Sequence, residues 1–389
     1  MKLDGLKTLV IGAGIGGLAV ARALALRGAD VTVLEQAAEI SEVGAGLQIS
    51  PNGFAVLEAL GLGDSLRAGA VQGRAVSLRD YRDSEVLRLD LGLLQNQNYY
   101  FVHRADLINL LANGARDVGV KIRLLQKVEQ VIPGDKPQVI LSNGTKVHTD
   151  LVVGADGLHS KLRPVLNGSA QPFFTGQVAW RAIVPNEAAR GPEAHVHMGP
   201  HRHLVSYPLR GGRDLNIVAV QARAAWTKES WSLRDDPMAL RAAFVDFGLE
   251  VHDMLAHVDQ VHLWGLFRHP VAAVWHQGGT ALLGDAAHPT LPFMAQGAVM
   301  ALEDAWVLAD ALTRQGTVAL GLASYQQRRE PRVRRVVQAA NGNARKYHLS
   351  FGPLRWAAHS ALRLGGAMAP ERMMAQFNWL YGHDVTGNP

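Results

Sequence analysis

Closely spaced glycines near the amino terminus form the first pattern that could do chemistry. Gly12, Gly14 and Gly17 satisfy the spacing G-x-G-x-x-G. In this pattern the first glycine permits a tight turn, the second lets a pyrophosphate approach the backbone, and the third lets a helix pack closely on a strand. Glu35 follows 18 residues after Gly17 and can accept hydrogen bonds from an adenosine ribose. A carboxylate there disfavours a 2′-phosphate, so the pattern predicts a site for FAD or NAD.

The same stretch must form a strand, a turn and a helix to position these groups. Residues 7–11 predict a short buried strand, residues 16–27 a helix and residues 31–35 a second strand. This order is typical of a βαβ unit with a parallel sheet, whose helix offers N–H groups and its positive dipole end to an anion. The unit explains the apolar run 9–26 better than a signal peptide or a membrane helix does, so we expect a cytoplasmic protein without membrane partners.

A second carboxylate, Asp285, follows another predicted buried strand at residues 280–284. Because ligands bind at the carboxyl ends of parallel strands, Asp285 is a candidate cofactor residue. The helix predicted from residue 296 to 313 directs its N-terminal amides to the same place, where they would favour an electron-rich group.

The middle of the chain has a different pattern. Between residues 177 and 266, strand-like segments surround one helical segment at residues 237–247. We expect an inserted, mostly antiparallel region there. From residue 320 the sequence predicts amphipathic helices. We expect their apolar faces to cover the core or to form a homodimer contact, with membrane contact as the alternative. The basic run 328–335 lacks interleaved aromatic residues, so we expect a solvated helix face and no nucleic-acid partner.

The composition excludes several kinds of site. The 389 residues carry a formal net charge of +5, which does not mark a nucleic-acid binder. There are no cysteines, so disulfide scaffolds, thiolate zinc sites, iron–sulfur clusters and cysteine nucleophiles are excluded. A second G-x-G-x-x-G is also absent, so a nicotinamide donor would bind without a Rossmann domain of its own.

Several longer motifs make the chain similar to a known family. They are "GAGLQISPN" (44–52), "HRADL" (103–107), "GADGLHSKLR" (154–163), "YPLRGG" (207–212), "GDAAHPTLP" (284–292) and "MAQGAVMALEDA" (294–305). Over nearly its whole length the sequence resembles the single-component FAD-dependent aromatic hydroxylases of the p-hydroxybenzoate hydroxylase fold. Within that family, its motifs most resemble those of the salicylate, 3-hydroxybenzoate and 6-hydroxynicotinate monooxygenases. Phe293 stands where the 6-hydroxynicotinate enzymes tend to have a histidine, which disfavours that substrate.

The resemblance implies an α/β fold with a discontinuous, Rossmann-like FAD-binding domain, an inserted substrate domain with a mixed or antiparallel sheet, and C-terminal helices. The expected boundaries are 1–73, 102–176 and 278–320 for the FAD-binding domain, 74–101 and 177–277 for the substrate domain, and 321–389 for the helical region.

The resemblance also implies which residues contact FAD. Asp285 would accept from ribitol hydroxyls, and Arg104 would contact the ribose or pyrophosphate. Gly46 belongs to a loop near the isoalloxazine, and Gln296 and Gly297 begin the helix that faces its pyrimidine side. Asp156 matches a fingerprint linked to FAD and the nicotinamide donor, and a loop Asp that caps the next turn is an equal alternative.

The activity implied is ring hydroxylation. NAD(P)H reduces FAD, O2 gives a flavin hydroperoxide, and one oxygen goes to a small phenolic aromatic such as salicylate or a hydroxybenzoate. We expect NADH to be preferred over NADPH, because no pocket for a 2′-phosphate is evident. Two alternatives stay open: a related monooxygenase for a larger polyketide or quinone-precursor substrate, and a non-enzymatic flavin-binding regulator. No residue can be assigned to a substrate carboxylate from the sequence.

Four histidines fall within residues 195–203. His195 and His197 share one face of a strand, which is ligand-like spacing, but no nearby carboxylate cluster in the sequence supports them. We therefore expect no metal, and ordinary strand histidines at 195, 197 and 201. His203 matches the family position four residues before Tyr207, on the same strand face. We predict that His203 is the acid–base residue, with Tyr207 beside it.

Overall fold

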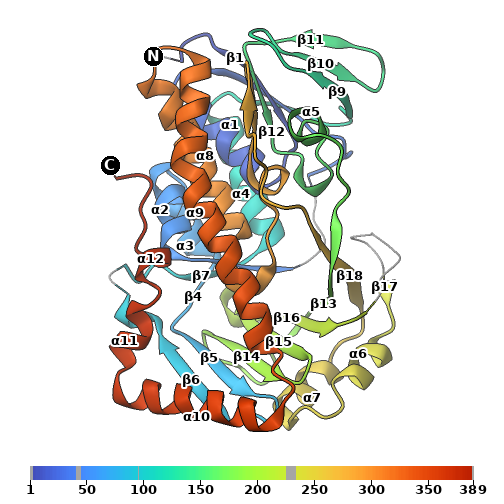
Figure 1. Cartoon of the computed structure of the whole chain (residues 1–389), viewed down its shortest axis with the longest axis vertical. Coiled ribbons are helices and arrows are strands. Elements are labelled where there is room, and N and C mark those ends of the chain that lie inside the picture. The colour runs from blue at the N-terminus through green and yellow to red at the C-terminus, as the bar shows by residue number, and fades with distance from the viewer. Residues whose placement is uncertain (1–2, 41–44, 95, 225–233, 388–389) are drawn as a thin grey trace.

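The computed structural model describes residues 3–40, 45–94, 96–224 and 234–387, and Figure 1 shows their arrangement. One sheet of six strands lies near the N-terminus, and one of eight strands lies at the opposite end of the elongated molecule. The long helix α9 (Val318–Tyr347) runs from the first sheet toward the second. The fold is mixed α/β, as the sequence predicted.

The first sheet contains the predicted βαβ unit. Strand β1 pairs in parallel with β2 and with β12, and the helix α1 (Ile15–Ala25) connects β1 to β2. Its only pair of antiparallel strands, within the part of the chain that the structure describes, is β19 with β20. In spatial order the strands are β19 (His276–Gln277), β20 (Thr280–Leu282), β12 (Leu151–Gly154), β1 (Lys7–Ile11), β2 (Asp30–Leu34) and β8 (Lys121–Arg123).

Helices cover this sheet because their apolar faces need partners. Helix α1 packs on α4 (Arg104–Asp117) and α8 (Gly297–Arg314), and α8 also contacts α9 and α2 (Pro51–Ala59). Leu18, Val20 and Leu24 of α1 are fully buried in the largest hydrophobic core. The smaller elements beside it are α3 (Gly63–Gly69), α5 (Arg163–Asn167), a sheet of β3 (Gly46–Ile49), β7 (Tyr100–His103) and β4 (Val71–Gln72), and a sheet of β9 (Val128–Ile132), β10 (Gln138–Leu141) and β11 (Lys146–His148).

The second sheet is built from the inserted region and is antiparallel except where β14 pairs with β5. In spatial order its strands are β17 (Arg234–Asp235), β18 (Val261–Arg268), β13 (Phe173–Pro185), β16 (Asp214–Ala222), β15 (Arg202–Leu209), β14 (Glu193–Gly199), β5 (Ala75–Asp80) and β6 (Glu85–Asp90). The helices α10 (Gly352–Met368) and α11 (Pro370–Ala375) pack against β6, and α12 (Asn378–Tyr381) contacts α2.

The predicted helical segment at 237–247 is present but shorter, and a second helix that the sequence did not predict follows it. The region forms two helices, α6 (Pro237–Ala243) and α7 (Leu249–Ala256), with the turn at Gly248 between them. Val251, Met254 and Leu255 recur at helical spacing in α7 and are buried in a core under the second sheet. Among the described helices, none is both long and apolar enough to cross a bilayer.

Candidate active site

A cavity of about 1500 Å³ lies between the two large sheets. Its walls include Gly12 and Glu35 from the first sheet and Val205 and Val220 from the second. Pockets for one small ligand usually have about 300–1000 Å³. This cavity therefore has room for a dinucleotide together with a second, smaller molecule.

One end of the cavity lies at the carboxyl ends of the parallel strands. Gly12 follows β1, Glu35 follows β2, Asp156 follows β12 and Asp285 follows β20, and all four residues line the cavity. Parallel pairing brings these four strand ends to one edge, which is where α/β sheets bind ligands.

The glycine turn has the shape that a pyrophosphate needs. Gly12 has φ +99°, and a Cβ on it would lie 2.5 Å from the carbonyl oxygen of Ala155. A Cβ on Gly17 would collide with the Gly12 carbonyl, so this glycine allows α1 to approach the strand. A Cβ on Gly14 would meet nothing within 4 Å, because that side faces the cavity. The N-terminus of α1 has no side-chain cap and no acidic residue in its first turn, which fits a bound anion.

Glu35 has a structural role beside its predicted one. Its two carboxylate oxygens accept from the backbone N–H groups of Ala13 and Ala37, both at 2.8 Å. Each oxygen has a second lone pair that can accept from a ribose hydroxyl. Glu35 therefore shapes the glycine turn and faces the cavity at the same time.

The other predicted cofactor residues differ in where their side chains lie. Arg104 at the start of α4, Asp285 and Gly297 line the cavity. Asp156 does not cap the short turn at 157–159 but accepts from the Lys161 N–H beyond it at 2.7 Å, while its Oδ1 has no hydrogen-bond partner among the described residues. Burial raises the pKa of Asp156. Gly46 also lines the cavity, whereas Gly44 of the same motif lies outside the described residues.

Gln296 is not among the cavity-lining residues. It is 1% exposed, donates to Ser50 Oγ at 3.0 Å and accepts from Asn52 Nδ2 at 3.2 Å. Its side chain thus ties α2 to the start of α8. Gly297, the first residue of α8, does line the cavity, together with Met294, Ala295 and Ala298 of the same motif.

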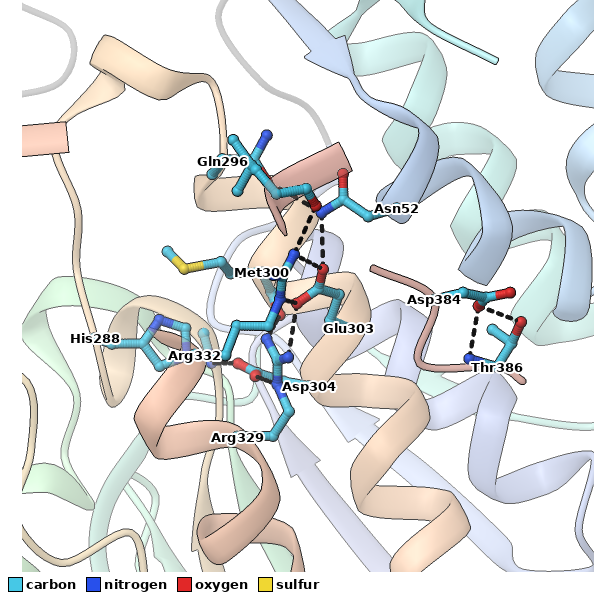
Figure 2. A network of polar contacts seen from close by, with 12 residues as sticks. Asn52, His288, Gln296, Met300, Glu303, Asp304, Arg329, Arg332, Asp384 and Thr386 are labelled. Atoms are coloured by element: carbon cyan, nitrogen blue, oxygen red, sulfur yellow. Dashed lines mark hydrogen bonds and ion pairs between the residues drawn. The ribbon is translucent and has the colours of Figure 1, made fainter. Parts of the chain in front are cut away.

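A buried network of charges supports this end of the cavity (Figure 2). Asp304 on α8 accepts from the Gly284 N–H at 3.1 Å, contacts His288 Nε2 at 2.6 Å and pairs with Arg329 at 2.7 Å. Glu303 pairs with Arg329 at 2.6 Å and Arg332 at 2.8 Å. The network therefore fixes the backbone next to Asp285 through residues that do not touch the cavity.

The expectation of a solvated face for the basic run 328–335 was wrong for two of its members. Arg329 is 1% exposed, and the Arg332 side chain is 10% exposed. The paired carboxylates Glu303 and Asp304 come from α8, so only the packing of α9 on α8 shows that these arginines are buried.

At the other end of the cavity, β15 provides the predicted catalytic pair. His203, Val205 and Tyr207 all line the cavity, so the expected alternation is confirmed. A strand rises about 3.3 Å per residue, which separates the Cα atoms of His203 and Tyr207 by about 13 Å. Their rings accordingly have different neighbours: Tyr207 packs on Phe101 at 5.1 Å, and His203 on Phe293 at 5.2 Å.

His203 has a partner that the sequence did not reveal. Its Nδ1 lies 2.7 Å from Nε2 of His348, which follows α9 in the chain. Burial and the neighbouring His348 lower the pKa of His203 well below its ordinary value, and burial lowers the pKa of His348 to about 4. Both rings are therefore neutral near pH 7, and one must donate the shared hydrogen bond to the other.

Two further residues adjoin Tyr207. Gly46 comes so close that a Cβ on it would lie 2.6 Å from Tyr207 Cε2, and its N–H donates to Asn216 Oδ1 at 2.7 Å. Arg181 on β13 lines the same cavity, with its guanidinium 4.2 Å from the centre of the Trp264 ring. Burial raises the pKa of Tyr207, against the opposing effect of Arg181, so Tyr207 is a neutral hydrogen-bond donor.

Known proteins are similar to this chain over most of its length. A family model described as an FAD binding domain matches residues 5–340. The 3-amino-4-hydroxybenzoate 2-monooxygenase of Streptomyces cremeus is 37% identical and covers 90% of this chain and 89% of that protein. The 3-hydroxybenzoate 6-hydroxylase of Polaromonas naphthalenivorans is 34% identical, with 98% and 96% covered. The chain belongs to the FAD-dependent aromatic-ring monooxygenases.

A solved structure has the same fold as this monooxygenase. HpxO of Klebsiella pneumoniae, complexed with FAD and uric acid, has a TM-score of 0.85 and 28% identity, with 95% of this chain and 96% of that chain covered. The monooxygenase has FAD as its cofactor, and the open side of Gly14 and the uncapped α1 fit the pyrophosphate of FAD. Sequence reasoning missed Arg181 and His348, since neither belongs to a motif.

Proposed function

We propose that this monooxygenase hydroxylates a small phenolic acid, using NAD(P)H and O2. The observation that carries the proposal is the hydrogen-bonded pair His203–His348 in an apolar part of the cavity. Bound FAD supplies the transfer of electrons from NAD(P)H to O2 and delivers one oxygen atom to the ring. This chain's residues must then orient the phenol, remove its proton and exclude water.

His203 acts on the phenolic proton. A phenol has a pKa of about 10 and is protonated at neutral pH, whereas a phenolate is much richer in electrons and more readily attacked by an electrophilic oxygen. With the His203 proton on Nδ1, this nitrogen donates to His348 and leaves Nε2 free to accept from the phenol. Burial makes His203 a weak base, but the imidazolium and phenolate formed together attract each other strongly in a dry cavity.

His348 extends this path toward solvent. When His203 takes a proton on Nε2, its Nδ1 can pass a proton to His348 Nε2, 2.7 Å away. His348 is only partly buried, so its ring can release the proton to solvent. The pair thus gives the proton a way out that does not admit bulk water to the ring.

Arg181 is the residue we assign to the substrate carboxylate. It is a permanent cation among the mainly apolar residues of the second sheet that line the cavity, such as Val205, Val218 and Leu266. A guanidinium can bind a carboxylate with two parallel hydrogen bonds, which would also fix the orientation of the ring. Tyr207, which interacts electrostatically with Arg181, would donate to the same end of the substrate. The names of the relatives, an aminohydroxybenzoate and a hydroxybenzoate hydroxylase, support an aromatic acid.

The test is a replacement of His203 with Gln in the FAD-loaded enzyme. Oxidation of NADH is measured against a panel of hydroxybenzoates, and product and hydrogen peroxide are then quantified separately. Positioned acid–base groups contribute about 10²–10⁴-fold, so the hydroxylation rate should fall by at least about a hundredfold, with oxygen diverted to peroxide. His148→Gln, an exposed histidine on β11, is the matched control. Wild-type yield and rate in His203→Gln would remove His203 from the mechanism.

A larger aromatic substrate is the second candidate. The cavity also reaches Met373, Phe377 and Tyr381 of the C-terminal helices, which supply apolar surface beyond that needed for a single ring. A panel that includes multi-ring phenols separates the candidates: coupled hydroxylation of multi-ring phenols alone would reject the small phenolic acid.

A further inference from the structure

Three potential metal ligands meet on the outer face of the second sheet, away from the cavity. Ala194, Val196 and Met198 of β14 line the cavity. Since side chains alternate along a strand, His195 and His197 point to the opposite face. There they meet Glu250 on α7, the helix that the sequence did not predict.

The distances suit one ion. Glu250 Oε2 lies 3.9 Å from His195 Nδ1 and 3.8 Å from His197 Nε2. One ligand atom from each residue lies within 4.8 Å of the others. Metal–nitrogen and metal–oxygen bonds in zinc sites are about 2.0–2.2 Å, so ligand atoms on opposite sides of one ion are separated by up to about 4 Å. Small side-chain adjustments would bring all three atoms into contact with it.

These atoms have no better partners in the structure. His197 is fully buried, and neither of its ring nitrogens makes a hydrogen bond with a described residue. Glu250 Oε2 is likewise buried without a hydrogen bond to any described group. Unsatisfied buried polar groups cost about 1–3 kcal/mol each and are rare. A shared ligand between the three side chains would remove this cost.

Neighbouring groups hold the three side chains in place. Arg79 donates to Glu250 Oε1 at 2.8 Å and leaves Oε2 directed at the histidines. Asp83 Oδ1 lies 3.5 Å from His197 Nδ1, and its Oδ2 accepts from the Glu250 N–H at 3.0 Å. A carboxylate behind a histidine ligand is the usual second-layer arrangement in metal sites.

We propose that His195, His197 and Glu250 bind one divalent transition-metal ion such as Zn²⁺ and so clamp α7 to β14. Two imidazoles and one carboxylate suit zinc or cobalt, whereas calcium and magnesium prefer oxygen ligands. The carboxylates of Asp83, Glu193 and Glu250 lie within 4 Å of nitrogens of the two histidines, against the nearby guanidinium groups of Arg79 and Arg190, so a cation is tolerated.

The experiment uses the full-length, FAD-loaded enzyme after treatment with a chelator. Zn²⁺ alone is titrated by calorimetry, and Co²⁺ alone by difference absorption at wavelengths beyond those of the flavin. We expect one equivalent of each to bind, a visible Co²⁺ band, and a higher temperature of unfolding with Zn²⁺. No saturable binding of either ion would overturn the proposal.

Variants assign the binding to this cluster. Removing a residue that hydrogen-bonds a metal ligand lowers metal affinity about 10–100-fold, so Asp83→Asn should lower the Zn²⁺ affinity within that range. Glu250→Gln removes a ligand itself and should lower the affinity at least about 100-fold. Asn tolerates the positive φ of 69° at position 83. The control His257→Gln removes a half-exposed histidine of the same region, 3.2 Å from Glu187, and should bind as the wild type does. Flavin absorbance reports the fold of each variant. Unchanged affinity in Glu250→Gln, or loss in His257→Gln instead, would overturn the assignment.

Discussion

Glu303→Gln tests whether the buried charge network stabilises the fold. Glu303 is 0% exposed and is held by Arg329, Arg332 and Asn52. Gln keeps the size of the side chain and removes its charge. Arg329 retains Asp304, but Arg332 loses the carboxylate with which it forms hydrogen bonds at 2.8 and 2.9 Å. A buried cation without its partner is strongly unfavourable.

The magnitude follows from the ionisation of Glu303. Burial opposes the charge, yet Arg329, Arg332 and Asn52 lower the pKa of Glu303 from 4.5 to about 2. Each pKa unit corresponds to about 1.36 kcal/mol, so the charged form stabilises the folded state by about 3 kcal/mol at pH 7. Because the folded pKa lies below the unfolded one, this stabilisation is complete above about pH 4.5 and declines as the pH falls toward 2. Near pH 3 it is about 1 kcal/mol.

Urea unfolding of the FAD-loaded enzyme at pH 7 and pH 3 measures both values. The variant should be less stable by about 3 kcal/mol at pH 7 and by about 1 kcal/mol at pH 3. Glu330→Gln is the control, because its ion pair with Arg334 at 2.7 Å is on the surface and should contribute less than about 1 kcal/mol. A difference below about 1 kcal/mol at pH 7, or one that does not change with pH, would refute the role given to the buried pair.

Four other predictions concern the FAD cofactor and the nicotinamide donor. The purified protein should be yellow, and denaturation should release its FAD, because the cofactor is bound non-covalently. Glu35→Ala should lower the affinity for FAD at least about tenfold in a fluorescence titration, since a hydrogen bond to a charged group contributes about 1.5–3 kcal/mol. Unchanged affinity would show that Glu35 only stabilises the glycine turn. Gly17→Ala should abolish FAD retention, because its Cβ would collide with the Gly12 carbonyl, and a yellow, folded variant would contradict this. NADH should have a higher kcat/KM than NADPH in steady-state assays, because no pocket for a 2′-phosphate is evident, and a strong NADPH preference would contradict this prediction.

The sequence determined the nucleotide end of the molecule because its signals are local. Gly12, Gly14 and Gly17 belong to one turn, and Glu35 ends the next strand, so backbone geometry alone brings them to one sheet edge. The alternation along β15 likewise placed His203 and Tyr207 on one face before any tertiary contact was known.

Tertiary structure decided everything that depends on which distant elements meet. Arg329 looked like part of a solvated basic run until α9 packed on α8 and supplied Glu303 and Asp304. His348 reached His203 across 145 positions of sequence. The sequence around His195 and His197 has no carboxylate cluster, and α7 brought Glu250 to them. Periodicity determines the face of an element on which a side chain lies, whereas its partner depends on how the apolar faces of all elements pack together.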